Sequence, residues 1–393
     1  MTLRVLTLST LFPDMSRPNF GVFVERQVRE LASRDGVEVT VVAPIGIAPW
    51  PLSRWPQYAS LQSLPLEEKW RDLTVHRPRF PILPKVGGRF HVTMMTRAIL
   101  PLVKRLHAEA PFDVIDASYF YPDGPVAQRI SAMLGIPYSV KARGSDVHIW
   151  GRMPGVRRHV REAARGAAGL LAVSQAMKRS MVALGMREDK IKVHYTGVDL
   201  DRFAPQDRAA AKAQFGLKGK VILCVGHLMG RKGQDILIRA LPDLPDTTLI
   251  LVGQGPDRSA FENLALELNV AERVGFLGAV PHDQLPALYN AADVMALPSA
   301  SEGLANAWVE ALACGTPIVI TDVGGAREVL TDPAAGQIVE RTPAAFADSL
   351  GKMLSHPPDR VAVRRAAIPF TWRTNGDVLL AHLNKVAGKT IEL

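Results

Sequence analysis

Covalent cross-links and membrane anchors are the features that this sequence most clearly lacks. Only two cysteines occur among 393 residues, and neither belongs to a Cys-x-x-Cys pair. Cys224 and Cys314 each lie in an apolar context, which favours two buried thiols over a disulfide or a zinc site. The apolar runs are strand-sized, well short of the roughly 20 residues that span a bilayer. The sequence therefore argues against a disulfide scaffold and against a membrane-spanning protein.

Low-complexity tracts are missing as well, and we expect no signal peptide at the N-terminus. Residues 1–14 read as one short strand ending in Phe12-Pro13-Asp14, without the long apolar region and small-residue cleavage site of a signal peptide. With 47% hydrophobic and 22% charged residues, the composition is that of an ordinary globular protein. We therefore expect a cytoplasmic protein.

Positive charge is concentrated in one half of the chain. Residues 1–200 contain 28 Lys and Arg against 17 Asp and Glu, a net charge of +11, whereas residues 201–393 have a net charge of −2. No helix-turn-helix, zinc or aromatic RNA-binding signature accompanies this charge, so we do not expect a nucleic-acid partner. An anionic lipid surface or a phosphorylated substrate fits the basic half better.

Aromatic residues lie close to the most basic stretch, residues 85–165. Trp50, Trp55 and Trp70 fall in a nearby insert, residues 45–70, which reads as a loop excursion rather than a domain. A basic and aromatic surface suits the headgroup region of a bilayer, and predicts peripheral association with the inner face of a membrane. A basic face that contacts only solvent is equally compatible with this pattern.

Short β-branched runs alternate along the chain with stretches of helical period, and the pattern restarts once. This order predicts parallel sheets with helices on both faces, and the length is too great for one core. We expect an α/β protein with two tandem Rossmann-like, doubly wound domains facing an interdomain cleft. The predicted domains are residues 1–200, for the acceptor, and 201–369, for the donor. A C-terminal helix, about residues 370–393, is expected to pack back on the first domain.

The stretch "VGHLMGRKGQDILI" combines a strand, a tight turn and a helix. Arg231, Lys232 and Gly233 occupy the turn, so two cations lie beside a helix N-terminus, where free N–H groups favour an anion. The strand–turn–helix context favours a phosphate site over a solvated basic turn. A second glycine turn, Gly253-x-Gly255-x-x-Arg258, lacks the third glycine of a dinucleotide fingerprint and is not interpreted as one.

Two glutamates frame the stretch "SEGLANAWVE", residues 301–310. Glu302 lies in a loop and Glu310 lies inside the following helix. Eight helical residues rotate by roughly 800°, so the two side chains would point about 80° apart around the helix and would not share one face. Both can still border one ligand, because Glu302 precedes the helix. The same spacing is also explained without a ligand, if Glu302 is an acid near the helix N-terminus, where it is favourable to the helix dipole, and Glu310 is an ordinary surface glutamate.

These motifs and their neighbours resemble glycosyltransferase family 4, the retaining GT-B group. The likeness runs from about residue 170 to 340, through "LVGQGPDRSAFENLALEL" and "VGFLGAVPHDQLPALYNAADVMALPSASEGLANAWVEALACGTPIVITDVGGAREVL". Glu302-x7-Glu310 matches the family's Glu-x7-Glu signature. The stretch "FPDMSRPNFGVFVERQVREL" is similar to the family's glycine loop and first helix.

The resemblance implies a nucleotide-sugar donor site. Glu310 would bind the ribose, Glu302 the donor sugar, and Arg231 with Lys232 the diphosphate. The remaining donor contacts would come from backbone atoms. Those of Gly303, Leu304 and Ala305 would contact the sugar or the diphosphate, and those around Phe276, Leu277 and Gly278 would contact the base. Gly21 would let the loop of the first domain approach the phosphates.

Two positions depart from the family pattern. His227 replaces the arginine that commonly follows the strand, and is expected either to contact the donor or to serve as a structural histidine. In "SVKARGSDVH", Arg143 stands where the family often has a histidine, followed by Ser145 and Asp146. Arg143 would contact the donor phosphate or the acceptor and could be oriented by Asp146, with Ser145 and Asp146 on the acceptor side. A salt bridge or a turn accounts for the same residues equally well.

The resemblance implies a retaining, metal-independent transfer from a UDP- or GDP-linked sugar to a glycan or lipid-linked acceptor, in cell-surface polysaccharide biosynthesis. No cofactor is expected, because placed cations can stabilise the departing diphosphate. The alternatives are another enzyme of this architecture, such as a sugar-nucleotide epimerase or a phosphorylase-like enzyme, and a non-catalytic sugar-nucleotide-binding protein.

Overall fold

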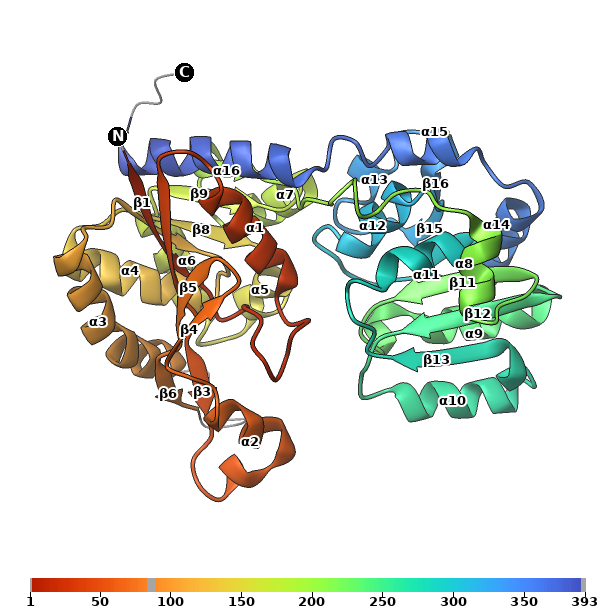
Figure 1. The fold of residues 1–393 in the computed structure, drawn as a ribbon, viewed down its shortest axis with the longest axis horizontal. Helices are drawn as coiled ribbons and strands as arrows, with labels where there is room; N and C mark the ends of the chain where they lie inside the picture. The colour runs from red at the N-terminus through yellow and green to blue at the C-terminus, as the bar shows by residue number, and fades with distance from the viewer. Residues whose placement is uncertain (1, 83–89, 390–393) are drawn as a thin grey trace. The chain divides into compact units, whose positions relative to one another are not determined.

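A computed structural model describes residues 2–82 and 90–389 of the protein (Figure 1). The chain divides into two compact units. The first unit comprises Met1–Tyr195 and Trp372–Leu393, and the second comprises Thr196–Thr371. The division therefore lies five residues before the predicted boundary at residue 200, and the chain returns to the first unit for its last helix.

The first unit is built on an eight-stranded sheet in which every neighbouring pair is parallel except the last. Its order is β10 (Ile191–Val193), β9 (Gly169–Ala172), β8 (Tyr138–Ala142), β7 (Val114–Ala117), β1 (Leu3–Leu8), β2 (Val37–Val42), β5 (Leu73–His76) and β4 (Glu67–Trp70). All residues of β7, β8 and β9 are buried. Strands buried on both faces read as largely apolar runs, which is why the sequence pattern identified them, although β7 and β8 also bury Asp116 and Lys141.

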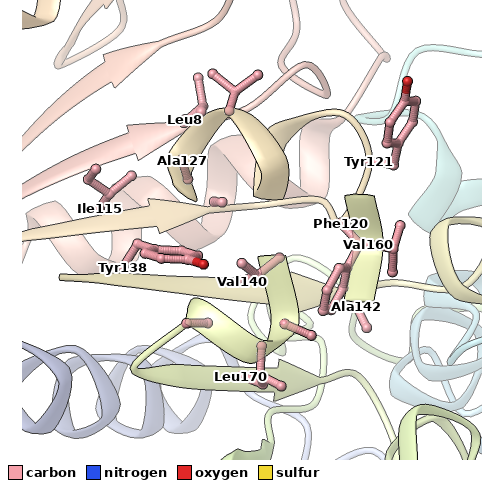
Figure 2. Packing of buried hydrophobic residues seen from close by; sticks show 14 of the residues in the cluster. Leu8, Ile115, Phe120, Tyr121, Ala127, Tyr138, Val140, Ala142, Val160 and Leu170 are labelled. Atoms are coloured by element: carbon pink, nitrogen blue, oxygen red, sulfur yellow. The ribbon is translucent and has the colours of Figure 1, made fainter. Parts of the chain in front are cut away.

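Helices cover both faces of this sheet. On one face, α1 (Val22–Ala32) and α16 (Trp372–Ala387) pack over a small cluster that includes Leu3, Leu171 and Leu379. On the other face, α3 (His91–Glu109), α4 (Asp123–Leu134) and α6 (Arg157–Gly166) pack over the large cluster shown in part in Figure 2. The C-terminal helix thus completes one layer of the first unit.

Shorter elements connect these layers. The insert at residues 45–70 is more regular than the loop predicted from sequence, since it contains two short helices and the start of a two-stranded parallel sheet. These are β3 (Ile45–Ile47) paired with β6 (Arg79–Pro81), η1 (Leu52–Arg54) and α2 (Pro56–Gln62). The remaining elements are α5 (Ser145–His148), η3 (Trp150–Arg152), α7 (Gln175–Ala183) and η4 (Glu188–Lys190).

The second unit contains a six-stranded parallel sheet. Its order is β13 (Val274–Gly278), β12 (Thr247–Val252), β11 (Lys220–Val225), β14 (Val294–Leu297), β15 (Ile318–Thr321) and β16 (Gly336–Val339). The chain starts at β11, proceeds outward to β13, and then returns to the other side of β11 at β14. The strand order therefore reverses between β11 and β14, which is where open α/β sheets bind ligands.

Two groups of helices flank the second sheet. In one group, α9 (Gln234–Ala240) packs against α10 (Arg258–Glu267) and α14 (Pro343–Ser355). In the other, α11 (Leu285–Ala291) packs against α8 (Arg208–Gln214) and α12 (Asn306–Ala313). The short elements are η5 (Gly230–Lys232), η6 (Leu241–Asp243), η7 (Ala271–Arg273), α13 (Ala326–Val329), η8 (Pro333–Ala335) and α15 (Arg360–Arg365). Both units are Rossmann-like, as predicted.

Long apolar helices are absent from the part of the chain that the structure describes. Among residues 2–82 and 90–389, no helix is both long enough and apolar enough to cross a membrane.

Candidate active site

The loops after β11 and β14 meet at the carboxyl end of the second sheet. Lys232, at the end of η5, donates from Nζ to Glu302 Oε1 at 2.5 Å, although the two residues are 70 positions apart. Ser299 Oγ donates to the same oxygen at 2.6 Å. Both charged side chains are largely buried, at 16% and 10% exposure. The sequence-predicted cation and carboxylate are therefore direct partners.

Arg231 ties the same two loops together. Its Nη1 donates to the carbonyl of Ser301 at 2.7 Å, and its own carbonyl accepts from the backbone N of Ala300 at 2.8 Å. These bonds hold the chain on either side of Lys232 and Glu302. They leave Arg231 beside the site that the sequence assigned to a diphosphate.

Glycine is required where the η5 turn enters α9. Gly233 has φ +78°, and a Cβ there would lie 2.3 Å from the carbonyl oxygen of Pro298. Gly324, after β15, has φ +53°, and its Cβ would lie 2.4 Å from the carbonyl oxygen of Glu302. Both positions combine a left-handed backbone with a close approach, so a side chain at either would displace the Glu302 loop.

Glu310 lies inside α12 and is held by two side chains from the segment around α11. His282 Nε2 donates to Glu310 Oε1 at 2.8 Å, and Tyr289 Oη donates to Oε2 at 3.1 Å. The Phe203 ring meets the His282 ring edge-on, with centroids 5.4 Å apart. Burial, with the Glu310 charge next to it, holds the pKa of Tyr289 well above its usual value, so its hydroxyl stays a donor. The Glu310 carboxylate is therefore fixed in direction before any ligand arrives.

Gly303, Leu304 and Ala305 form the turn between Glu302 and α12. The carbonyl of Gly303 accepts from the backbone N of Gly325 at 2.8 Å, which anchors the turn to the loop after β15. Ala305 is the N-cap of α12 and provides no side-chain cap. The first N–H groups of this eight-residue helix consequently have no capping side chain, the condition under which amides bind a ligand oxygen.

The predicted base-binding segment lies on the edge strand β13. The Arg258 guanidinium lies over the Phe276 ring at 5.7 Å, Leu277 is 43% exposed, and Gly278 has φ +68°. His227, after β11, is exposed, and its carbonyl accepts from Gln234 Nε2 at 3.0 Å. Its ring makes no hydrogen bond, ion pair or aromatic contact with the residues that the structure describes.

In the first unit, Arg143 follows β8 and is clamped from three sides. Its Nε donates to the carbonyl of Ser118 at 2.7 Å, its Nη2 donates to Gln27 Oε1 at 3.2 Å, and the guanidinium lies 4.9 Å from the Phe23 ring centroid. Burial lowers the pKa of Arg143 to about 10, partly offset by Asp116 and Asp146. The group stays cationic at neutral pH.

Asp146 serves the turn itself rather than an acceptor. It is fully buried and accepts backbone N–H bonds from Phe120, Arg143, Gly144 and Val147 at 2.7–3.1 Å. A carboxylate with these four donors has no exposed oxygen for a substrate, so its expected acceptor-side position is revised. It orients Arg143 through the backbone only.

Ser145 and Gly21 complete the predicted positions of the first unit. Ser145 Oγ lies 2.5 Å from Tyr119 Oη, where either group can donate. Gly21, the N-cap of α1 with φ +68°, would place a Cβ 2.5 Å from the carbonyl oxygen of Leu11. The loop after β1 therefore packs directly on Gly21, which is the structural reason for glycine here.

Comparison with known proteins bears directly on these two units. Residues 21–202 match the family model described as Glycosyltransferase Family 4, and residues 205–369 match the model described as Glycosyl transferases group 1. The chain is 36% identical over 274 residues to the GDP-mannose-dependent alpha-(1-6)-phosphatidylinositol monomannoside mannosyltransferase of Mycolicibacterium smegmatis, covering 64% of this chain and 70% of that protein. The chain belongs to glycosyltransferase family 4.

Further relatives of this family 4 glycosyltransferase agree. It is 39% identical over 205 residues to the D-inositol 3-phosphate glycosyltransferase of Mycobacteroides abscessus, covering 49% of this chain and 46% of that relative's length. Sucrose-phosphate synthase from Thermosynechococcus elongatus has a TM-score of 0.80 at 20% identity, covering 98% and 99% of the two chains. HepE from Anabaena, solved with UDP, has a TM-score of 0.72 at 23% identity, covering 98% and 100%. At these identities the two structures show the fold alone.

Sequence reasoning missed a buried polar cluster beneath Arg143 in the glycosyltransferase. Lys141 Nζ donates to Gln27 Oε1 at 2.8 Å and to His194 Nδ1 at 3.0 Å, so Gln27 Oε1 accepts from both cationic side chains. Burial lowers the pKa of Lys141 well below its usual value. Burial also raises the pKa of Asp116 to about 6, partly offset by Arg143 and Lys141. The one available signal was a lysine inside the otherwise apolar strand "YSVKA".

The partners of the two glutamates were also missed. Ser299, His282 and Tyr289 lie in stretches that matched the family pattern, but no spacing rule connects them to Glu302 or Glu310. Their roles became visible only once the loops after β14 and before α11 were placed in space.

A possible metal motif of the glycosyltransferase was overlooked as well. Asp199-Leu200-Asp201 has the spacing of an Asp-x-Asp triplet, but Asp199 Oδ1 accepts from the backbone N of Asp201 and Arg202, both at 3.1 Å, as in an ordinary turn. Within residues 2–82 and 90–389, no three metal-ligating side chains gather at one place.

Proposed function

We propose that this glycosyltransferase transfers a sugar from a nucleotide-diphosphate sugar to a glycan or lipid-linked acceptor, with retention at the anomeric carbon and without a metal ion or cofactor. The observation that carries the proposal is the gathering of Arg231, Lys232 and Glu302 at the β11–β14 switch point, with Glu310 held on the helix that follows. Two cations, a carboxylate for sugar hydroxyls and a second carboxylate for the ribose are the parts that such a donor needs.

Metal independence is proposed from the chemistry of the leaving group. Breaking the anomeric C–O bond places negative charge on the departing diphosphate, and Arg231 and Lys232 are in position to stabilise it. Each pre-placed donor of this kind contributes roughly 3 kcal/mol to the transition state. The uncapped amides at the start of α12 add further N–H groups beside Glu302. The departing phosphate would itself accept the proton of the attacking hydroxyl on the same face, which gives retention.

In the absence of donor, Lys232 and Glu302 neutralise each other. A diphosphate would take over the Lys232 ammonium, and the donor sugar's hydroxyls would take over the Glu302 oxygen. The exchange keeps both charges partnered, which matters because an unpaired buried charge is costly. Arg143 is proposed as a further contact to the donor phosphate or the acceptor, since its Nη1 is not used by the Ser118 and Gln27 bonds described above.

The donor is proposed to be UDP- or GDP-linked. GDP-mannose appears in the name of the mycobacterial relative, which places it first among the donors to test. The same relatives act on acceptors named as a phosphatidylinositol monomannoside and an inositol 3-phosphate, so inositol phosphates belong in the acceptor panel. We place the reaction in cell-surface polysaccharide or glycolipid biosynthesis.

Peripheral contact with an anionic membrane is part of the proposal. Arg157, Arg158, Arg161 and Arg165 are exposed on α6, and Ile149 and Met153, just before it, are 47% and 41% exposed. Trp50 and Trp55 in the insert are 75% and 50% exposed. Cationic and apolar side chains on the surface of one unit suit a headgroup layer. Residues 83–89, part of the predicted basic stretch, lie outside the described residues.

The deciding experiment is isothermal titration calorimetry with UDP and GDP, followed by turnover of a nucleotide-sugar panel in the presence and absence of EDTA. We expect micromolar binding of one nucleotide, turnover that EDTA leaves unchanged, and a product with the donor's anomeric configuration by NMR. If neither nucleotide binds, the donor site is wrong. If a nucleotide binds but no sugar moves, the non-catalytic alternative replaces this proposal, and interconversion of nucleotide sugars would favour an epimerase.

A further inference from the structure

A cavity of about 710 Å³ lies at the edge of the first unit's sheet, away from Arg143. It is bordered by the residues that begin β9 and β10, such as Gly169 and Ile191, and by α16. Arg143 follows the carboxyl end of β8, whereas the cavity lies at the amino ends of the neighbouring parallel strands. We call it the α16 cavity. Its volume is in the range of small-molecule sites, about 300–1,000 Å³.

Small residues bring α16 close to the sheet and leave this space open. A Cβ on Gly169 would lie 2.6 Å from Cε1 of His382 and 2.8 Å from Cγ2 of Val386, so only glycine permits this approach. Ala168 and Ala381 also line the cavity. On the helix, lining residues recur every fourth position in two adjacent rows, 377-381-385 and 378-382-386, which form one continuous face. β10 is the edge strand of the sheet, so none of the strands that the structure describes closes this side.

The acidic residues of the α16 cavity are already neutralised. Asp189 is paired with Arg187 at 2.5 Å, and Asp377 is paired with Arg34 at 3.0 Å. Lys190 is also engaged, since its Nζ donates to the carbonyls of Arg165 and Ala167 at 3.2 and 2.7 Å. These three ionisable groups therefore offer little to a ligand.

Two lysines remain. Lys192, on β10, shares its register position with Leu171 of β9, whose side chain packs on α16, so Lys192 faces the helix. Lys385 lies on α16 itself. Neither ammonium makes a hydrogen bond or an ion pair with the residues that the structure describes. Both line the cavity, and the uncompensated charge of the site is positive.

His382, on the α16 side of the cavity, is uncharged. It is 9% exposed, and its Nε2 lies 2.7 Å from Ser139 Oγ. Burial, together with the charges of Lys385, Lys141 and Lys192, lowers its pKa to about 4.

We propose that the α16 cavity binds an amphiphile with an anionic head group, a carboxylate or a phosphate. The head group lies between Lys192 and Lys385, and the apolar chain lies against Ile191, Val378 and Val386. The head group is expected to be anionic because Asp189 and Asp377 are paired and His382 is neutral, which leaves the positive charges of the two lysines uncompensated. The rest of the ligand is expected to be apolar because the remaining lining is apolar. This site is independent of the donor site and of the proposed function.

Calorimetry on the full-length protein tests the proposal with dodecanoate and dodecyl phosphate, each below its micelle concentration. We expect saturable one-to-one binding of at least one of them and none of dodecyltrimethylammonium. The tighter of the two anions identifies the head group. Lys192→Glu and Lys385→Glu should each weaken binding tenfold or more, whereas Lys218→Glu, a reversal at an exposed lysine of the second unit, should leave it unchanged.

A second readout separates specific binding from general adsorption. An anion between the two lysines offsets their charge, so the pKa of His382, followed by NMR, should rise on saturation. Ala381→Phe should fill the cavity and abolish binding while circular dichroism stays native. Binding that is absent below the micelle concentration, or equal in both lysine variants and wild type, overturns the proposal. A dimer by light scattering that Ala381→Phe dissociates would also overturn it, since the cavity would then be an interface between two copies.

Discussion

Lys232 Nζ lies 2.5 Å from Glu302 Oε1, joining the loops that follow β11 and β14, and Ser299 Oγ shares the same oxygen. The pair predicts a particular pattern in binding measurements. Lys232→Ala should weaken nucleoside-diphosphate binding by more than tenfold, because it removes a cation and leaves Glu302 facing the diphosphate unpaired. In a Glu302→Gln background the same change should cost less. Calorimetry on the four proteins of this cycle measures the difference, and equal losses in both backgrounds would show that the two residues act independently.

Glu310 should matter for the ribose and not for the phosphates. Its carboxylate lies on α12 and is held by His282 and Tyr289. Glu310→Gln should therefore weaken UDP or GDP binding by about 10- to 100-fold, the range expected for lost hydrogen bonds to a charged group. Inorganic pyrophosphate should bind the variant and wild type equally. A matching loss for pyrophosphate would place Glu310 at the phosphates instead.

Arg143 is predicted to need its planar guanidinium. Arg143→Lys keeps the charge but cannot satisfy Ser118, Gln27 and a substrate oxygen together, so kcat should fall by at least tenfold. Gln27→Leu should lower kcat in the same direction through Arg143, with KM for the donor changed little. Steady-state kinetics with a thermal melt distinguishes this from unfolding. A Gln27→Leu variant with wild-type kcat would remove Gln27 from this role.

Asp116 should shape the dependence of stability on pH. Its pKa rises from 3.8 to about 6 on folding, so the folded state holds this proton more tightly than the unfolded chain. The resulting stabilisation is complete below the unfolded pKa and is lost as the pH rises through about 6. Between pH 4 and pH 7 the wild-type protein should lose this stabilisation, whereas Asp116→Asn should not. The fall in the free energy of unfolding over this range should therefore be about 1–3 kcal/mol smaller in the variant. Urea titrations at the two pH values measure it, and parallel curves would contradict the prediction.

Gly233 is predicted to be irreplaceable because its φ is positive and because a Cβ would clash with Pro298. Gly216 has a positive φ without such a contact, so comparing the two glycines separates these two effects. Gly233→Ala adds a Cβ 2.3 Å from the Pro298 carbonyl at φ +78°, whereas Gly216→Ala adds one in open space at φ +65°. Gly216→Ala should cost about 1 kcal/mol for its backbone alone. Gly233→Ala should cost at least twice that and also weaken nucleotide binding, because the displaced turn carries Lys232. Similar unfolding free energies for the two variants would mean that the contact with Pro298 relaxes freely.

Much of the fold was accessible from the sequence. Apolar runs such as "VILCV" predicted central parallel strands, and their alternation with helical periods predicted two doubly wound units, as observed. The insert was harder, because its short strand β3 pairs with β6, where Ile45 stands opposite Arg79, and carries little local pattern. Asp146 was assigned to the acceptor side because a sequence does not show that a carboxylate is enclosed by backbone amides.

The sequence alone determined where each residue of the proposed donor site stands on its element: Arg231 and Lys232 in a turn after a strand, Glu302 before a helix and Glu310 within it. Only the tertiary structure decided their partners. Lys232 meets Glu302 because the strand order places β14 beside β11, and Glu310 meets His282 and Tyr289 because α11 packs on α12. Spacing along the chain reports local geometry over a few residues, whereas contacts across 70 residues depend on strand order and on loops that pack through their backbones.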